Sequence, residues 1–236
     1  MEKQILDFSL VPLGLCSLLA YHIWLLHRII NHPTSTVIGI NGINRRVWVR
    51  TMMEESSKNG ILAVQTLRNN IMASTVLAST AIMLSSVVAI IMANSKARPS
   101  DEIVFGIQSE LGFWIKFFSI LVCFLLAFLF NVQSIRYYSH ASILINVPVK
   151  KMISPHLMVE YVGRTVNRGS CFWSLGLRAF YFSFPLFLWL FGPIPMFLCC
   201  VVLVFMLYFL DVTFDFGGAI GVVDDEEKGR EKERER

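Results

Sequence analysis

The sequence predicts an all-α integral membrane protein, a polytopic bundle of four to five transmembrane helices. Of its 236 residues, 55% are hydrophobic and only 16% are charged, and the mean hydropathy is +0.58. The apolar residues gather in runs near or above the roughly 20 residues that cross a hydrocarbon layer. Lys and Arg stand at the ends of these runs, as in proteins whose basic residues face anionic headgroups. We therefore expect membrane lipids, and no nucleic acid, as partners of the basic residues.

The first three spans are predicted near residues 6–26, 71–92 and 111–130. Each is an apolar run bounded by polar or basic residues. The first run continues through Tyr21–Leu26 without a small-residue cleavage site, so it predicts a retained span and not a removed signal peptide.

The region from residue 173 to 212 is too long for one crossing, because forty residues of helix measure about 60 Å. It must break at Gly192–Pro195, since Pro lacks an N–H and disfavours helix in the residue before it. A kink gives four spans, whereas a reversal gives five, with the last two near 173–191 and 194–212. The loops 27–70, 93–110 and 131–178 carry six, two and six Lys and Arg, respectively. This places the first and third loops in the cytoplasm and favours the reversal, which returns the basic tail to that side.

Residues 1–223 are predicted to form a single transmembrane domain, followed by a disordered charged tail at 224–236. The tail holds seven acidic and five basic residues and no apolar residue that could be buried. Residues 41–50 and 58–67 mix apolar and basic residues at near-helical spacing, which suggests short segments on the membrane surface and long helices that project into the cytoplasm.

A possible internal repeat suggests a binding region for anionic ligands. Two apolar runs each end in Arg, two bulky residues, Asn or Ser, and then His, and a Leu-Arg pair follows about forty residues after each. Two copies of one helical hairpin, in parallel orientation, would produce this pattern. The candidate residues for lipid headgroups are Arg28, His32, Arg68, Arg136, His140 and Arg178. Joined by loop arginines such as Arg45 and Arg46, they could form a ring that binds phosphoinositide-type headgroups or guards an anion pathway. The alternative is that these arginines only fix helix ends at the interface.

The second span carries a stripe of small residues that predicts a helix-packing face. Small side chains let helix backbones approach closely in lipid. The stripe comprises Ser74, Ala78, Ala81, Ser85, Ala89 and Ala93. Packing within the chain is the favoured interpretation, and a homo-oligomer contact or a pore lining is the alternative.

No residue pattern indicates catalysis, a metal site or a cofactor. His22, His27 and His32 recur every five residues, which spreads them around a helix instead of converging them on a metal. Nucleotide-binding and hydrolase motifs are missing from the sequence, so an enzyme is the least favoured class. Asp7, Lys116 and Asp211 lie near span ends, where we expect them to reach the interface.

Three runs, Ala63–Ala73, Ser134–His140 and Phe172–Phe182, together with Gly192–Pro195, carry a family resemblance. They resemble a plant family of membrane proteins catalogued as domain of unknown function five-nine-nine. The resemblance implies a multi-span protein of a plant plasma membrane or endomembrane and supplies no activity. Two hypotheses stay open: a membrane scaffold or regulator with basic loops that contact anionic lipid or a partner protein, and a channel or carrier for a small solute or anion.

Overall fold

The computed structural model describes residues 2–95, 110–148 and 153–212, and it confirms the all-α class. The elements are α1 (Glu2–Asn31), the 3-10 turn η1 (Pro33–Ser35), α2 (Val37–Glu54), α3 (Ser56–Ser95), α4 (Glu110–Leu144), α5 (Pro155–Leu188) and α6 (Pro193–Asp211). In these ranges the β pairing is one isolated bridge between Thr36 and Val212. The predicted tail at 224–236 lies outside the described residues.

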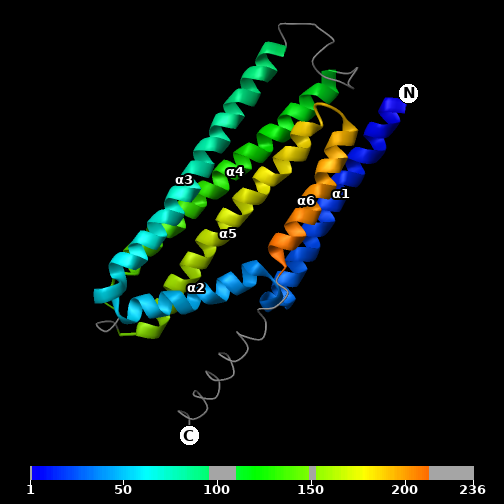
Figure 1. Cartoon of the computed structure of the whole chain (residues 1–236). Helices are drawn as coiled ribbons and strands as arrows, with labels where there is room; N and C mark the ends of the chain where they lie inside the picture. Colours follow the sequence, from blue (N-terminus) through cyan, green and yellow to red (C-terminus); the bar gives the residue numbers. More distant parts are fainter. Residues whose placement is uncertain (1, 96–109, 149–152, 213–236) are drawn as a thin grey trace.

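Five helices, α1, α3, α4, α5 and α6, are long and apolar enough to cross a membrane. They lie alongside one another and alternate in direction, so α1 begins at one end of the bundle and α6 finishes toward the other (Figure 1). Only 17% of the most apolar stretch of α6 is buried inside the bundle, and 28% of that of α1. Apolar side chains therefore face outward along most of each helix, as a hydrocarbon solvent requires.

The break in the last apolar region is a reversal and not a kink. Gly192 has φ +146°, a backbone conformation that is essentially restricted to glycine. Pro193 follows at the first position of α6, where its missing N–H costs no hydrogen bond. The chain thus turns back between Leu188 and Pro193, and the arrangement matches the five-span alternative.

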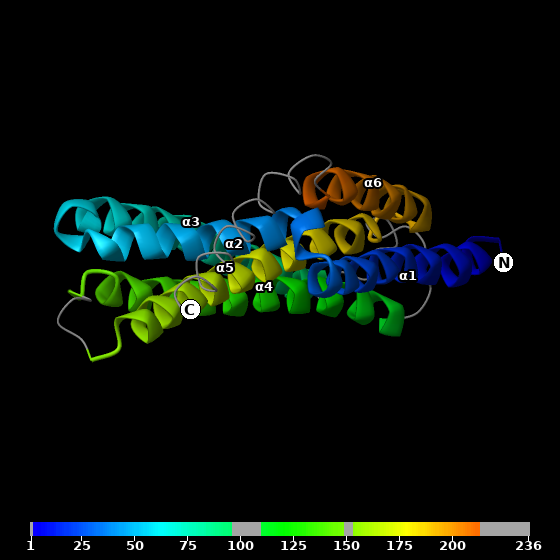
Figure 2. The ribbon, with the colours of Figure 1, turned by 90° about the horizontal axis from the view of Figure 1, so that it is seen from below.

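The helices pack as α3, α4 and α5 on one side and α1 with α6 on the other. The repeat predicted two similar hairpins, one from the first two spans and one from the next two. Of these, α4 and α5 form the second, whereas α1 and α3 do not pair extensively. The reason is α2, an 18-residue helix about 27 Å long that crosses one end of the bundle and separates α1 from α3 (Figures 1 and 2). The predicted hairpin repeat is therefore wrong for the first copy.

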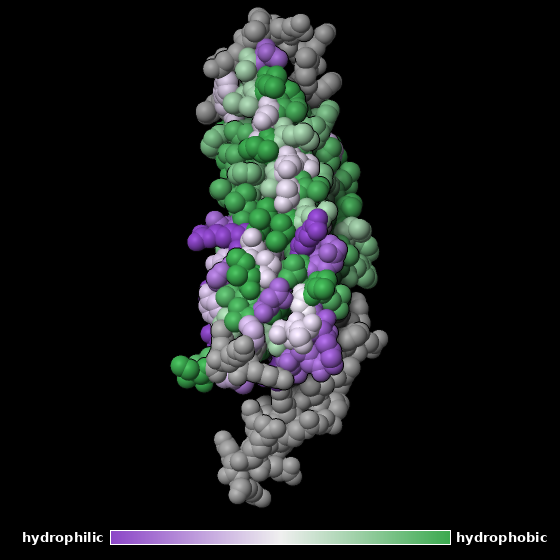
Figure 3. Space-filling view, turned by 90° about the vertical axis from the view of Figure 1, so that its left-hand side faces the viewer, coloured by the Kyte–Doolittle hydropathy of each residue, from purple (hydrophilic) through white to green (hydrophobic). Residues whose placement is uncertain are grey.

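The helices α3, α4 and α5 are the longest of the bundle and extend well beyond the thickness of the hydrocarbon layer. The 40 residues of α3 span about 60 Å, against about 30 Å for the hydrocarbon layer. At the end where α2 lies, α2, α3, α4 and α5 share a second hydrophobic core that includes Val49, Met53, Leu67, Ile145 and Val162. Hydrophilic residues gather on this half in Figure 3, below a mostly hydrophobic half. We call the half with α2 the polar lobe.

Residues 58–67 do not form a separate surface segment as predicted. They are the first turns of α3, and Ala63 and Leu67 are fully buried in the core of the polar lobe. The near-helical spacing is correct, and the segment buries Ala63 and Leu67 against protein, whereas Ile61 and Leu62 are 88% and 57% exposed.

The small-residue stripe of α3 is only partly a packing face. Ser74, Ala78, Ala81 and Ser85 are buried, whereas Ala89 and Ala93 are exposed. Successive steps of four residues advance about 40° each around a helix, so the last two alanines rotate away from α4. Val88 takes the next buried position instead.

Candidate functional site

A cleft of about 660 Å³ lies between η1 and α2 on one side and α5 and α6 on the other. This volume is within the range of small-molecule sites. The residues that line it include Val37, Gly42, Arg45, Arg46, Asn167, Ser170, Cys171, Trp173, Leu177, Arg178, Tyr181, Leu207, Leu210 and Asp211.

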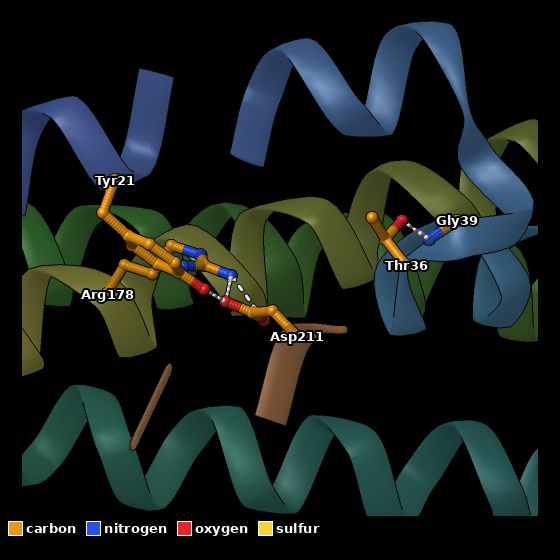
Figure 4. A network of polar contacts seen from close by, with 5 residues as sticks. All are labelled: Tyr21, Thr36, Gly39, Arg178 and Asp211. Carbon is orange, nitrogen blue, oxygen red and sulfur yellow. Dashed lines mark hydrogen bonds and ion pairs between the residues drawn. The ribbon is translucent and has the colours of Figure 1, made fainter. Parts of the chain in front are cut away.

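Local structure at the start of α2 sets one wall of the cleft. Thr36 is fully buried, and its Oγ1 accepts a hydrogen bond from the Gly39 amide at 3.2 Å, which caps the helix (Figure 4). A Cβ at Gly39 would lie 2.1 Å from the Pro33 carbonyl oxygen, so only glycine fits this turn. One turn further on, Asn167 Nδ2 donates to the Gly42 carbonyl at 2.9 Å and joins α5 to α2.

A buried ion pair forms the opposite wall. Arg178 Nη2 lies 2.9 Å from both carboxylate oxygens of Asp211, and Tyr21 Oη donates to Asp211 Oδ2 at 2.8 Å (Figure 4). The side chains of Arg178 and Asp211 are only 13% and 11% exposed. This cluster joins α5, α6 and α1. Asp211 is the last residue of α6, and its carboxylate is paired with Arg178 inside the bundle.

The cleft carries more positive than negative groups. Arg45, Arg46 and Arg178 line it against one carboxylate, that of Asp211, which is already paired. Burial lowers the pKa of the Arg45 guanidinium, although arginine remains charged at neutral pH. A negative ligand group would therefore meet favourable electrostatics in this cleft.

Three residues of the lining have a buried polar atom without a hydrogen-bond partner. These atoms are Arg178 Nη1, Trp173 Nε1 and Asn167 Oδ1. An unsatisfied buried group costs about 1–3 kcal/mol, so native structures contain few of them. Asn167, Trp173 and Arg178, all of α5, thus bring polar groups to the cleft lining that the protein itself leaves unsatisfied.

The six predicted headgroup residues do not form a ring. Arg28 Nε donates to Ser35 Oγ at 3.1 Å, and its guanidinium lies over the Trp24 ring. His32, between α1 and η1, Arg68 of α3 and Arg136 of α4 are all exposed.

The remaining two members of that set differ from each other. His140 is exposed and lies 3.2 Å from the Tyr161 hydroxyl, whereas Arg178 alone lines the cleft. Ser134 of α4 contacts Gly169 of α5, and Arg178 lies nine residues further along α5, about 14 Å from that level. This axial offset separates Arg178 from Arg136.

Sequence reasoning missed Tyr21, Asn167 and Trp173 as site residues. One signal was available, because Arg178 and Asp211 are the two charged residues between residues 173 and 212. Two opposite charges inside one apolar region predict a pair once the region folds back on itself. Among the residues that the structure describes, no three His, Cys, Asp or Glu side chains gather as metal ligands.

These features define a polytopic helical membrane protein with a basic cleft beside its polar lobe. Residues 9–216 match the family described as "Protein of unknown function, DUF599", and the chain belongs to this family. No curated protein and no solved structure matches the chain. The family resemblance seen in the sequence is thus confirmed.

Proposed function

We propose that the protein is a membrane scaffold or regulator that does not conduct solutes and whose basic residues contact anionic lipid. The observation that carries this proposal is the use of the α3 hydroxyl groups. Ser74 Oγ lies 3.2 Å from Ser134 Oγ, which donates to the Gly169 carbonyl at 2.8 Å, so these hydroxyls join α3, α4 and α5. A polar path along α3 would need such groups to face water.

The apolar core supports the same conclusion. Ala81, Ile120 and Ala127 are fully buried where α3 meets α4, within a cluster that also includes residues of α1, α5 and α6. Thr75 and Ser86 face outward, and their hydroxyls donate to carbonyls of their own helix four residues back. The hydroxyls of Ser74, Thr75 and Ser86 thus contribute to packing or to local helix bonds, whereas Ser85 Oγ is buried without a hydrogen-bond partner.

The contact with lipid is supported by three exposed arginines on neighbouring helices. The hydrogen bonds of Ser134 with Ser74 and Gly169 mark one level along the bundle axis. Arg136 and Arg168 lie within two residues of this level, about 3 Å along their helices, and Arg68 lies six residues before Ser74, about 9 Å along α3. We call these three the arginine band. Basic residues at one level suit the headgroup region. The cytoplasmic side and a plant plasma membrane or endomembrane stay predictions, as does a homo-oligomer.

The test compares nanodiscs of phosphatidylcholine with nanodiscs that also contain phosphatidylserine. We expect the anionic lipid to raise the Tm of the full chain, because each basic residue near an anionic surface contributes about 1 kcal/mol. A triple variant in which all three arginines of the arginine band are replaced by Gln should lose this increase in Tm. Lys58→Gln is the control, since Lys58 lies ten residues before Arg68, about 15 Å along α3. Equal Tm values in both lipids would refute the proposal.

The cleft itself favours a second candidate, a carrier for a small anion. Purified protein in liposomes should show the chloride and phosphate flux of protein-free liposomes if it is a scaffold. Arg136 is exposed on the outer side of α4, so Arg136→Ala should leave that background unchanged. Flux above background that Arg45→Gln in the cleft lining lowers, and that Arg136→Ala leaves unchanged, would favour the carrier.

A further inference from the structure

We propose that the cleft between α2, α5 and α6 binds one phosphate-bearing amphiphile whose headgroup carries free hydroxyls, as in phosphatidylinositol or phosphatidylglycerol. This inference rests on the proposed contact with anionic lipid and assigns a defined site and ligand class to it.

The basic wall accounts for the phosphate. Arg46 is exposed, Arg45 is partly buried, and among the described residues neither is paired with a carboxylate. The donors Arg178 Nη1 and Trp173 Nε1 lack acceptors. Phosphate oxygens supply several strong acceptors at once, and arginine is the residue best suited to them.

The hydroxyl requirement comes from Asn167. Its Nδ2 donates to the Gly42 carbonyl, which fixes the orientation of the amide, and its Oδ1 is left buried without a donor. A phosphodiester has no hydrogen to give to this oxygen. A hydroxyl of glycerol or inositol does, so one headgroup can satisfy both the donors and the acceptor of the cleft.

The apolar wall accounts for the acyl chains. Leu177 and Tyr181 of α5 line the cleft together with Leu207 and Leu210 of α6, and Leu210 is 57% exposed. The surface beyond it, including Phe209, is apolar and exposed on a membrane-spanning helix. The ligand can therefore place its headgroup against α2 and its acyl chains along α6. Each buried methylene strengthens such binding about fourfold, which a free headgroup cannot reproduce.

The cleft contains its own reporter, because Cys171 lines it and is exposed. The full chain in mild detergent is labelled with a maleimide, and mass spectrometry follows the modification of Cys171. Arg164→Cys supplies a reference thiol, since Arg164 is exposed on α5 and is not part of the cleft lining. We expect dioctanoyl phosphatidylinositol to slow labelling of Cys171 and to leave the reference thiol unaffected.

Four matched probes test each part of the assignment. Dioctanoyl phosphatidylcholine tests the negative charge, dioctanoyl phosphatidylmethanol tests the hydroxyls, and glycerophosphoinositol and inorganic phosphate test the acyl chains. Each should protect Cys171 at least about tenfold less well than phosphatidylinositol, the loss expected when a charge-assisted hydrogen bond or two methylenes are missing. Equal protection by any one of them overturns the part of the proposal that it tests.

A variant links protection to the basic wall. Arg46→Gln should raise the apparent Kd for dioctanoyl phosphatidylinositol about tenfold or more, whereas Arg164→Gln should not change it. Arg46 is exposed, so its loss should leave folding intact.

The outcomes separate this inference from the proposed function. Unprotected Cys171, in a protein that phosphatidylserine nanodiscs still stabilise, overturns the cleft inference and leaves the lipid contact standing. A protein that anionic lipid neither stabilises nor protects refutes both.

Discussion

Replacing Asp211 by Ala should destabilise the protein by about 3–5 kcal/mol, the cost of leaving one member of a buried ion pair without its partner. The geometry supports a value in this range. Arg178 loses both hydrogen bonds of 2.9 Å, and the Tyr21 hydroxyl loses its acceptor at 2.8 Å. Both charged side chains are almost buried, so water replaces these contacts poorly.

The assay is unfolding in mixed micelles by titration with sodium dodecyl sulfate, followed by tryptophan fluorescence. Two companion variants divide the effect. Asp211→Asn keeps an acceptor for Tyr21 and should cost less than Asp211→Ala. Tyr21→Phe removes one hydrogen bond and should cost about 1 kcal/mol, near the values found between membrane helices.

The control is an exposed ion pair in the same chain. Arg164 and Glu160 lie on the surface of α5 with side chains 65% and 44% exposed. Glu160→Ala should therefore change stability by less than about 1 kcal/mol. A loss for Asp211→Ala as small as that of Glu160→Ala would refute the view that the buried pair holds α6 in place.

Four further substitutions test the packing and the turn. Gly192→Ala should destabilise by about 1–3 kcal/mol because the residue has φ +146°, and a lower Tm in detergent would report it. Gly176→Ala should also lower the Tm, because its Cβ would lie 2.5 Å from Asn131 Nδ2, whereas Gly163→Ala on the same helix meets no atom closer than 3.7 Å and should raise it. Ser134→Ala should cost about 0.6 kcal/mol in the same mixed-micelle titration, the mean for hydrogen bonds between membrane helices.

The helical class and the five apolar helices could be predicted from composition and run length, because the bilayer imposes both. The break at Gly192 could be predicted as well, since a region of forty apolar residues exceeds the hydrocarbon thickness and Gly-Pro cannot continue a helix. The hairpin repeat failed for a physical reason. Short motifs at helix ends record where chains meet the interface, but not which helices pack together.

The cleft could not be predicted because its parts come from distant segments. Arg45 and Arg46 belong to α2, Asn167 and Arg178 to α5, and Asp211 to the end of α6. Their convergence depends on the direction in which α2 crosses the bundle and on the depth of α6. No local sequence pattern specifies either of these, although the opposite charges of Arg178 and Asp211 could have indicated one contact.

The buried pair of Arg178 and Asp211 can fix the axial position and the rotation of α6 against its neighbours. This helix is 19 residues long and almost wholly apolar, and lipid offers little reason to prefer one rotation over another. Replacing both charges, as in Arg178→Met with Asp211→Leu, should restore most of the stability lost in Asp211→Ala, since apolar replacements of buried pairs are often neutral.

The position of α6 can be measured separately from stability by disulfide cross-linking to α1. A Cβ at Gly14 of α1 would lie 3.5 Å from Cys200 Cβ of α6, a separation that suits a disulfide. Gly14→Cys should therefore cross-link to Cys200 on oxidation when α6 holds its place against α1. We expect efficient cross-linking when Arg178 and Asp211 are present, and clearly less cross-linking in the variant with Arg178→Met and Asp211→Leu. Equal cross-linking in both would show that apolar packing alone positions α6.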